Sequence, residues 1–274
     1  MASSIRAKND LLRTANRLHL HLYHFARGVY PAATGIPGSH PVNRCLMPLE
    51  NKDQEESYIK DSKQQLVMRP GHIYFIPAHH RVAVRLTENM RFISIQFLLD
   101  FHNGIDLFSQ VKKIIELENP RLTAQADHTF DSESAHLLGV RLQSVVMELT
   151  AMLFERIEPD DLCLNMTADL SETTLNNLHE RCTAKTTVAE LAEQSNLCRD
   201  AFSRNFTRKN GISPKQFLNR CIMYRACSLL ATGNLKIREI AEKLEFANEF
   251  YFSRFFKKHS GMSPAQFRKE KFHP

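Results

Sequence analysis

Residues 201–217, AFSRNFTRKNGISPKQF, occur again in altered form as residues 251–267, YFSRFFKKHSGMSPAQF. At this spacing of 50 residues the two stretches share a Phe-Ser-Arg start and a Gly, Ser-Pro, Gln and Phe end. Upstream, Leu191-Ala192-Glu193 matches Ile240-Ala241-Glu242 at a spacing of 49. Self-similarity of this length indicates that the C-terminal part of the chain contains two copies of one structural unit.

Each copy has the pattern of a helix, a short turn and a second helix. In the first copy, Thr187 followed by Glu190 predicts a capping box at a helix start. The second helix is expected over about residues 198–209 and ends at Gly211, since glycine adopts the left-handed conformation without strain. Ser213-Pro214 then begins the next helix as N-cap and first helical residue.

The second copy predicts the same arrangement, with helices at Ile237–Leu244 and Asn248–Lys258. One long helix, from Pro214 to about Thr232, joins the copies and stops at Gly233. A helix-turn-helix places its second helix in the DNA major groove. A joining helix of this length, roughly 28 Å at ~1.5 Å per residue, would allow two second helices to enter successive major grooves.

The outward faces of the two second helices carry side chains that can hydrogen-bond base edges or phosphates. The alternative is that these are solvated charged faces. The base-reading candidates are Arg199, Asp200, Ser203, Arg204, Asn248, Glu249, Ser253 and Arg254. The phosphate-contacting candidates are Arg208, Lys209, Lys257 and Lys258.

Charge is distributed unevenly along the 274 residues, whose formal net charge is +6. Residues 173–274 contain 18 Lys and Arg against 9 Asp and Glu, whereas residues 1–172 contain 18 against 21. A basic C-terminal part beside a mildly acidic N-terminal part favours a nucleic-acid footprint at one end of the chain. The six cysteines show no CxxC pair or zinc-site spacing, which predicts reduced thiols and a cytoplasmic protein.

Two such units on one long helix, each with the motif FSRxF…G[IM]SPxQF, resemble the AraC/XylS family of bacterial transcription factors. The resemblance covers about residues 173–274 and implies an all-α DNA-binding domain there. One departure concerns the turn of each unit, where the family usually has glycine and this chain has Asn196 and Glu245. Asn tolerates the left-handed conformation more readily than Glu. Lys236 is also a poor N-cap for the second copy.

From Leu18 to Leu99 the apolar pattern changes to period two, which is typical of strands. Many short strands separated by turn residues indicate a β-barrel or sandwich. The segment LVMRPGHIYFIPAHHRV resembles the small cupin-like barrel that serves many members of the same family as effector domain. The expected strands are HLHLYHF, NRCLMPL, SYIKD, QLVMR, HIYFI, VAVRL and RFISIQF.

Polar and aromatic residues within the predicted barrel are candidates for binding a polar effector such as a sugar. They are His21, Tyr23, Arg44, Tyr74, His80 and Arg81, and the alternative for each is an exposed or structural role. A metal centre is not expected, because adjacent His79 and His80 point to opposite faces of a strand. His19 and His21 have a suitable spacing, but no Glu follows them at short range.

Two helical stretches are expected after the barrel, within about residues 105–157. Ile105–Leu117 is short and amphipathic, and Asp131–Ile157 is longer. The longer one has a heptad seam that could pair two subunits or, alternatively, pack on the barrel of its own chain. The seam residues are Leu138, Leu142, Val145, Leu149 and Met152. Residues 158–174 are acidic and poorly periodic, which predicts an interdomain linker.

The predicted fold class is therefore α+β with two domains. Residues 1–170 form a cupin-like effector-binding and dimerising domain, and residues 173–274 form a DNA-binding domain. The expected function is sequence-specific transcription regulation by a homodimer, with duplex DNA, a small-molecule effector and RNA polymerase as partners. No cofactor is expected. The N-terminus has no signal-peptide core and no apolar run has the ~18 residues of a membrane span. The alternative is a cupin-type metalloenzyme with a basic helical appendage.

Overall fold

A computed structural model describes residues 18–29, 33–35, 37–51, 56–100, 106–131, 134–162, 170, 174, 178, 181–210, 212–231 and 234–272. Within the chain, two compact units are distinguished. One comprises Met1–His21, Leu98–Ser109 and Cys163–Phe256, and the other Leu22–Phe97, Gln110–Leu162 and Lys257–Pro274. The expected linker and the boundary near residue 170 fall mostly outside the described residues and stay predictions.

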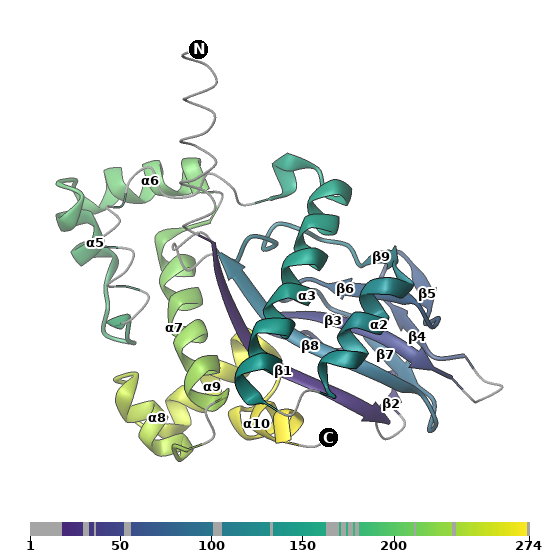
Figure 1. Ribbon diagram of the computed structural model, residues 1–274. Coiled ribbons are helices and arrows are strands. Elements are labelled where there is room, and N and C mark those ends of the chain that lie inside the picture. Colours follow the sequence, from purple (N-terminus) through teal and green to yellow (C-terminus); the bar gives the residue numbers. More distant parts are fainter. Residues whose placement is uncertain are drawn as a thin grey trace, which may run out of the picture. The chain divides into compact units, whose positions relative to one another are not determined.

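The N-terminal half is built on two antiparallel sheets, drawn in purple and blue in Figure 1. The first has the order β1 (His19–Val29), β8 (Arg91–Asp100), β3 (Asn43–Glu50), β6 (His72–Ile76) and β9 (Ile115–Glu118). The second has the order β2 (Ala33–Thr34), β7 (Ala83–Leu86), β4 (Tyr58–Lys60) and β5 (Gln65–Val67). All seven strands expected from the period-two pattern are present, because alternation places one face of each strand in a core.

The two sheets enclose one apolar core. Leu46 and Tyr74 from the first sheet pack with Ile59 and Leu86 from the second. Strand β3 is paired with both β6 and β8, and residues directly opposite one another share a face. Leu46 therefore points between the sheets, whereas its neighbour Met47 points to the other face and is fully buried there.

The helix expected at Ile105–Leu117 is not formed, and this prediction is wrong. Residues 107–110 form a turn, and Ile115–Glu118 is strand β9, paired antiparallel with β6. Ile115 and Leu117 are buried while Glu116 and Glu118 are exposed, which is strand alternation and not a helical face. Residue 105 itself lies outside the described residues. The first helix among the described residues, α2 (Pro120–Thr129), begins after Asn119, whose side chain accepts a hydrogen bond from the amide of Leu122.

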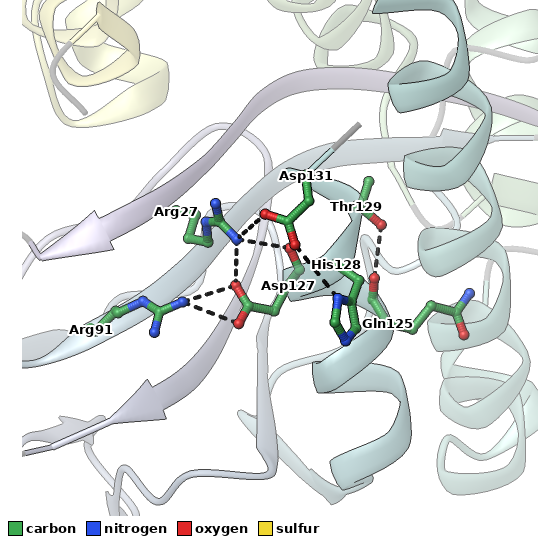
Figure 2. A network of polar contacts seen from close by, with 7 residues as sticks. All are labelled: Arg27, Arg91, Gln125, Asp127, His128, Thr129 and Asp131. Carbon is green, nitrogen blue, oxygen red and sulfur yellow. Dashed lines mark hydrogen bonds and ion pairs between the residues drawn. The ribbon is translucent and has the colours of Figure 1, made fainter. Parts of the chain in front are cut away.

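Helices α2 and α3 (Ala135–Arg156) lie over the five-stranded sheet, in teal in Figure 1. A network of charged side chains at the C-terminal end of α2 holds that helix to the sheet (Figure 2). Arg27 Nη1 on β1 donates to Asp127 Oδ1 at 2.9 Å and to Asp131 Oδ1 at 3.1 Å, and Arg91 Nη2 on β8 donates to both Asp127 oxygens at 3.1 Å. The hydrogen bond with Asp127 raises the pKa of Arg27. The Arg27 guanidinium also lies 4.9 Å from the ring centre of Phe130.

The predicted heptad seam of α3 is largely buried within the chain's own unit. Leu142, Val145 and Leu149 are buried, and Met152 accepts a hydrogen bond from the Asn119 side chain at 3.2 Å. Leu138 is half-buried. This placement favours the alternative in which the seam packs on the chain's own β-structure.

Among the described residues, α3 is the one helix long and apolar enough to cross a membrane by length and composition, with a mean hydropathy of 1.5. The sequence-based expectation concerned an uninterrupted apolar run of ~18 residues, which this helix does not contain because Arg141 and Glu148 interrupt it. A core helix of a soluble protein passes the same test, so the match is weak evidence for a membrane span.

The C-terminal part is helical and follows the repeat. The first copy comprises α5 (Val188–Gln194) and α6 (Arg199–Asn210), and the second α8 (Ile237–Lys243) and α9 (Glu249–Ser260). Between them runs α7 (Pro214–Ala231), and α10 (Pro264–Phe272) follows. Gly211, Thr232 and Gly233, the expected helix ends, lie outside the described residues.

The recurring Ser-Pro-x-Gln motif is a repeated helix start. Ser213 accepts from the amide of Gln216 at 3.2 Å, and the Gln216 side chain accepts from the amide of Ser213 at 2.8 Å. Ser263 and Gln266 make the same pair of bonds, at 3.2 and 2.9 Å. Each pair satisfies two amides that the first turn of a helix leaves without partners. The Thr187–Glu190 capping box is also confirmed.

The turn in each helix-turn-helix unit requires the left-handed conformation. Asn196 has φ of 54° and Glu245 has φ of 55°, at equivalent places in the two copies. Thr183 Oγ1 donates to Glu245 Oε2 at 2.6 Å, which helps to hold the less favourable residue in place. The departure from glycine therefore leaves both turns with the same backbone form.

Candidate nucleic-acid interface

Helix α6 presents its polar face to solvent because its apolar residues face inward. Phe202 and Phe206 are buried and lie 5.5 Å apart between ring centres. Arg199, Asp200 and Arg204 are exposed on the remaining surface of the helix. Ser203 is half-buried at the margin of that surface. The face available to a partner is thus centred on Arg204.

Helix α9 repeats this arrangement. Phe252 and Phe256 are buried and Arg254 is exposed at the position equivalent to Arg204. Within the described part of the chain, neither arginine side chain has a hydrogen-bond or ion-pair partner. An arginine free of internal bonds can donate both of its outer nitrogens to O6 and N7 of a guanine. Glu249 is exposed and Ser253 is half-buried on the flanks of α9.

Asn248 has a structural role that limits base reading. Its Oδ1 accepts a hydrogen bond from the amide of Tyr251 at 3.0 Å, which makes it the N-cap of α9. An asparagine that reads adenine needs this oxygen to accept from N6 while its amide group donates to N7. The same oxygen cannot serve both purposes at full strength.

Basic side chains continue along both helices beyond the base-reading positions. Arg208 on α6 and Lys257 and Lys258 on α9 are exposed. Lys209 belongs to α6, but its side chain lies outside what the structure describes. These positions are suited to phosphate contacts, which fix the register of a protein on duplex DNA.

Helix α7 sets the separation between the two helix-turn-helix units. Its 18 residues correspond to about 27 Å at 1.5 Å per residue. In Figure 1, α5 and α6 lie at one end of α7 and α8 and α9 at the other. The first unit has a core of its own in which Leu191, Phe202, Phe206 and Phe217 pack together. Each second helix is therefore carried on a packed support.

Of the predicted effector-binding residues, several have structural partners. The Tyr74 hydroxyl donates to the carbonyl of Val67 at 2.6 Å and accepts from the amide of Arg69 at 3.0 Å, and burial raises its pKa. His80 Nε2 lies 2.9 Å from Asp61 Oδ2. Burial opposes ionisation of Asp61, but hydrogen bonds from His80 and two backbone amides lower its pKa overall. These side chains stabilise the β-structure.

The remaining effector candidates are dispersed. Arg81 is exposed and Tyr23 is buried. His21 Nε2 lies 3.6 Å from Oδ2 of the buried Asp100, which also accepts from the hydroxyl of Tyr224 at 3.0 Å. The six predicted residues therefore do not form one cluster.

Arg44 is the candidate whose place best fits a ligand site. It lies opposite Gln96 in the β3–β8 pairing, two residues from the Leu46–Ser94 pair, so the side chains of these four residues share the face between the sheets. Gln96 is buried, and its Oε1 has no hydrogen-bond partner among the described residues. Gln96 and Ser94 were not expected from the sequence, because only strand register places them beside Arg44.

In the part of the chain that the structure describes, no group of three or more His, Cys, Asp or Glu is placed to hold a metal ion. His19 and His21 lie 5.9 Å apart between ring centres at the start of β1.

Comparisons with known proteins agree with the geometry of the C-terminal part. The family described as "Helix-turn-helix domain" matches residues 191–270. The Msm operon regulatory protein of Streptococcus mutans is 27% identical over 164 residues, which cover 60% of this chain and 55% of that protein. The probable transcriptional regulator LumQ of Photobacterium leiognathi is 25% identical over 238 residues, covering 84% and 90%. Residues 191–270 therefore match a helix-turn-helix domain, in agreement with the resemblance of this part of the chain to the AraC/XylS family.

A protein of known structure has a similar mixed α/β fold, with a β-rich N-terminal and a helical C-terminal part. The crystal structure of wild-type ToxT from Vibrio cholerae with a bound unsaturated fatty acid gives a TM-score of 0.54. The likeness covers 93% of this chain and 96% of ToxT at 13% identity, so it concerns the fold alone. The chain spans about half the length of the Streptococcus relative.

The outward face of α9 includes two residues that the sequence interpretation missed. Phe250 and Tyr251 are 81% and 61% exposed in the first turn of that helix. The signal was present in the repeat, because Phe250 corresponds to the exposed Asp200 of α6 and not to a buried position. Aromatic residues in a helical period are usually assigned to a core, which concealed them.

Proposed function

We propose that this chain is a sequence-specific DNA-binding transcription regulator, not an enzyme, whose two helix-turn-helix units bind neighbouring major grooves on one face of the duplex. The observation that carries this proposal is the equivalent placement of Arg204 and Arg254. Both are exposed, both lie on the face opposite a buried Phe pair, and the two helices are linked through α7. The high positive charge of residues 173–274 supports the same proposal.

The test is the salt dependence of binding to duplex DNA. If about six basic side chains displace counterions, the logarithm of the binding constant should fall with the logarithm of salt concentration with a slope of about −5. Replacing both Lys257 and Lys258 by Gln should reduce the magnitude of this slope by about 2. The matched control replaces the exposed Lys60 and Lys63 of the β-structure by Gln and should leave the slope unchanged. Absence of duplex binding by the full chain at low salt would refute the proposal.

The β-rich half is proposed to be a cupin-like effector domain that binds a small polar molecule such as a sugar. Support comes from the face between the sheets, where Arg44, Ser94 and the unpaired buried amide oxygen of Gln96 come together. A buried polar atom without a partner costs free energy, which a ligand donor would recover. Thermal unfolding measured against a panel of sugars and carboxylates should show a stabilising ligand for the wild type. The same ligand should stabilise Gln96→Leu less, whereas an Arg81→Gln control should respond as the wild type does.

A homodimer through α3 is also proposed, but on a different face from the predicted seam. Leu137, Val140 and Phe154 are 44%, 65% and 36% exposed. These three residues form one stripe along α3 together with Ser144, Met147 and Ala151. The successive positions 137, 140, 144, 147, 151 and 154 alternate between spacings of three and four residues, which is a heptad pattern. A second copy of this helix would cover that stripe. We further propose that the protein is cytoplasmic and that RNA polymerase is one of its partners.

A further inference from the structure

The first turn of α9 carries the most exposed large apolar side chain that the structure describes. Phe250 is 81% exposed, although a side chain of this type normally contributes to folding by being buried. It lies in a helix whose other Phe residues, at 252, 255 and 256, are buried or half-buried. Its exposure therefore requires a reason specific to its position.

Helix geometry gives the direction in which Phe250 points. At 3.6 residues per turn, a residue two positions before the buried Phe252 lies roughly 160° around the helix from it, on the opposite side. Phe250 precedes Arg254 by four residues and Lys257 by seven, so these three side chains share one face. Helical side chains also lean toward the N-terminus of the helix. Phe250 thus projects from the end of α9 that, in a recognition helix, contacts base edges.

We propose that Phe250 reads thymine in the half-site of the second helix-turn-helix unit, by packing its ring against the C5-methyl group. This rests on the proposed DNA-binding function and assigns a base to that site. The thymine methyl is the apolar feature among the base edges of the major groove, whereas the other edges present donors and acceptors. Asn248, the polar candidate beside it, has its side-chain oxygen bonded to the amide of Tyr251.

In the first helix-turn-helix unit, the position equivalent to Phe250 is expected to contact a different base. Asp200 of α6 is the equivalent of Phe250, and it too is exposed. A carboxylate accepts a hydrogen bond from the N4 amino group of cytosine and gains nothing from a methyl group. With Arg204 and Arg254 equivalent, the two half-sites share a guanine contact but differ at the neighbouring base. The recognised sequence is therefore directional along the DNA.

The experiment removes one methyl group from the DNA. A duplex is first selected by the full chain from a random-sequence pool, and each thymine in it is then replaced singly by deoxyuridine, which keeps base pairing. Burial of one carbon group contributes about 0.8 kcal/mol, so one replacement should weaken binding about four-fold. In Phe250→Ala the thymine and uracil forms of that position should bind equally. Phe250→Leu should retain part of the discrimination, and Asp200→Ala should retain all of it.

The possible failures can be told apart. If every uracil duplex binds the wild type as the thymine duplex does, or if Phe250→Ala still discriminates between them, the thymine assignment is wrong while DNA binding stands. If Phe250→Ala changes the oligomeric state and leaves the selected sequence unchanged, Phe250 belongs to a protein interface and the assignment is equally wrong. If the wild type selects no duplex at low salt, both this inference and the proposed function fail. Circular dichroism of each variant verifies that the helices are intact.

Discussion

The left-handed residue in the second helix-turn-helix turn offers a quantitative test of the fold. Glu245 has φ of 55°, a conformation that costs an L residue roughly 1–2 kcal/mol and costs glycine little. Its side chain is held by Thr183 at 2.6 Å and lies 3.8 Å from the Lys185 ammonium. Both contacts are exposed, and such pairs contribute about 0–1 kcal/mol. The conformational cost of the left-handed backbone should therefore outweigh these side-chain contacts when Glu245 is replaced.

The difference in stability between Glu245→Gly and Glu245→Ala isolates this conformational cost, because both variants lose the same side-chain contacts. Glycine gives up more freedom on folding, which costs roughly 0.5–1 kcal/mol. After this offset, the Gly variant should be more stable than the Ala variant by about 1 kcal/mol. At Glu242, an exposed residue within α8, the order should reverse, with Gly less stable than Ala by roughly 0.5–1 kcal/mol.

The appropriate assay is hydrogen exchange of the full chain under native conditions, at the amides of Leu244 and Phe252. These amides bond to the carbonyls of Ile240 and Asn248 at 2.9 and 3.2 Å, so their exchange reports the opening of α8 and α9. The reasoning is refuted if Gly and Ala at position 245 protect these amides equally. The same holds if the order at 245 matches the order at 242.

Three further outcomes are expected. Asp127→Asn should lower the free energy of unfolding by about 1–3 kcal/mol, because Arg27 and Arg91 lose their shared carboxylate; Asp131→Asn, which removes one exposed bond, should cost under about 1 kcal/mol in the same urea titration. Arg254→Ala should weaken binding to a selected duplex by roughly 1–3 kcal/mol and relax the base preference at one position, whereas Lys257→Ala should weaken binding to selected and scrambled duplexes alike. Fluorescence anisotropy would measure both, and equal losses from the two variants on both duplexes would make Arg254 a phosphate contact. Val140→Glu should give a folded monomer by sedimentation, whereas Leu142→Glu should unfold the β-rich half because Leu142 is buried; a dimeric Val140→Glu protein would exclude the exposed stripe of α3.

Features set by neighbouring residues were predictable from the sequence alone. The doubled motif predicts two helix-turn-helix units because capping, helix period and turn chemistry act over a few residues. The Thr187–Glu190 capping box and the helix start at Ser213-Pro214 are confirmed on this basis. The seven strands are present because a period of two determines a half-buried strand wherever it packs.

Tertiary structure decided what depends on residues far apart in the chain. The heptad seam of α3 is apolar whatever it packs against, so the sequence alone left open whether the seam would pair two subunits or pack on the β-structure of its own chain. Strand register places Arg44 opposite Gln96, 52 positions away, and no local pattern contains that pairing. Ile115–Glu118 became a strand because β6 offered an edge to pair with. Asn248 and Phe250 look like a polar reader and a core residue, but the fold makes the first a helix cap and leaves the second in solvent.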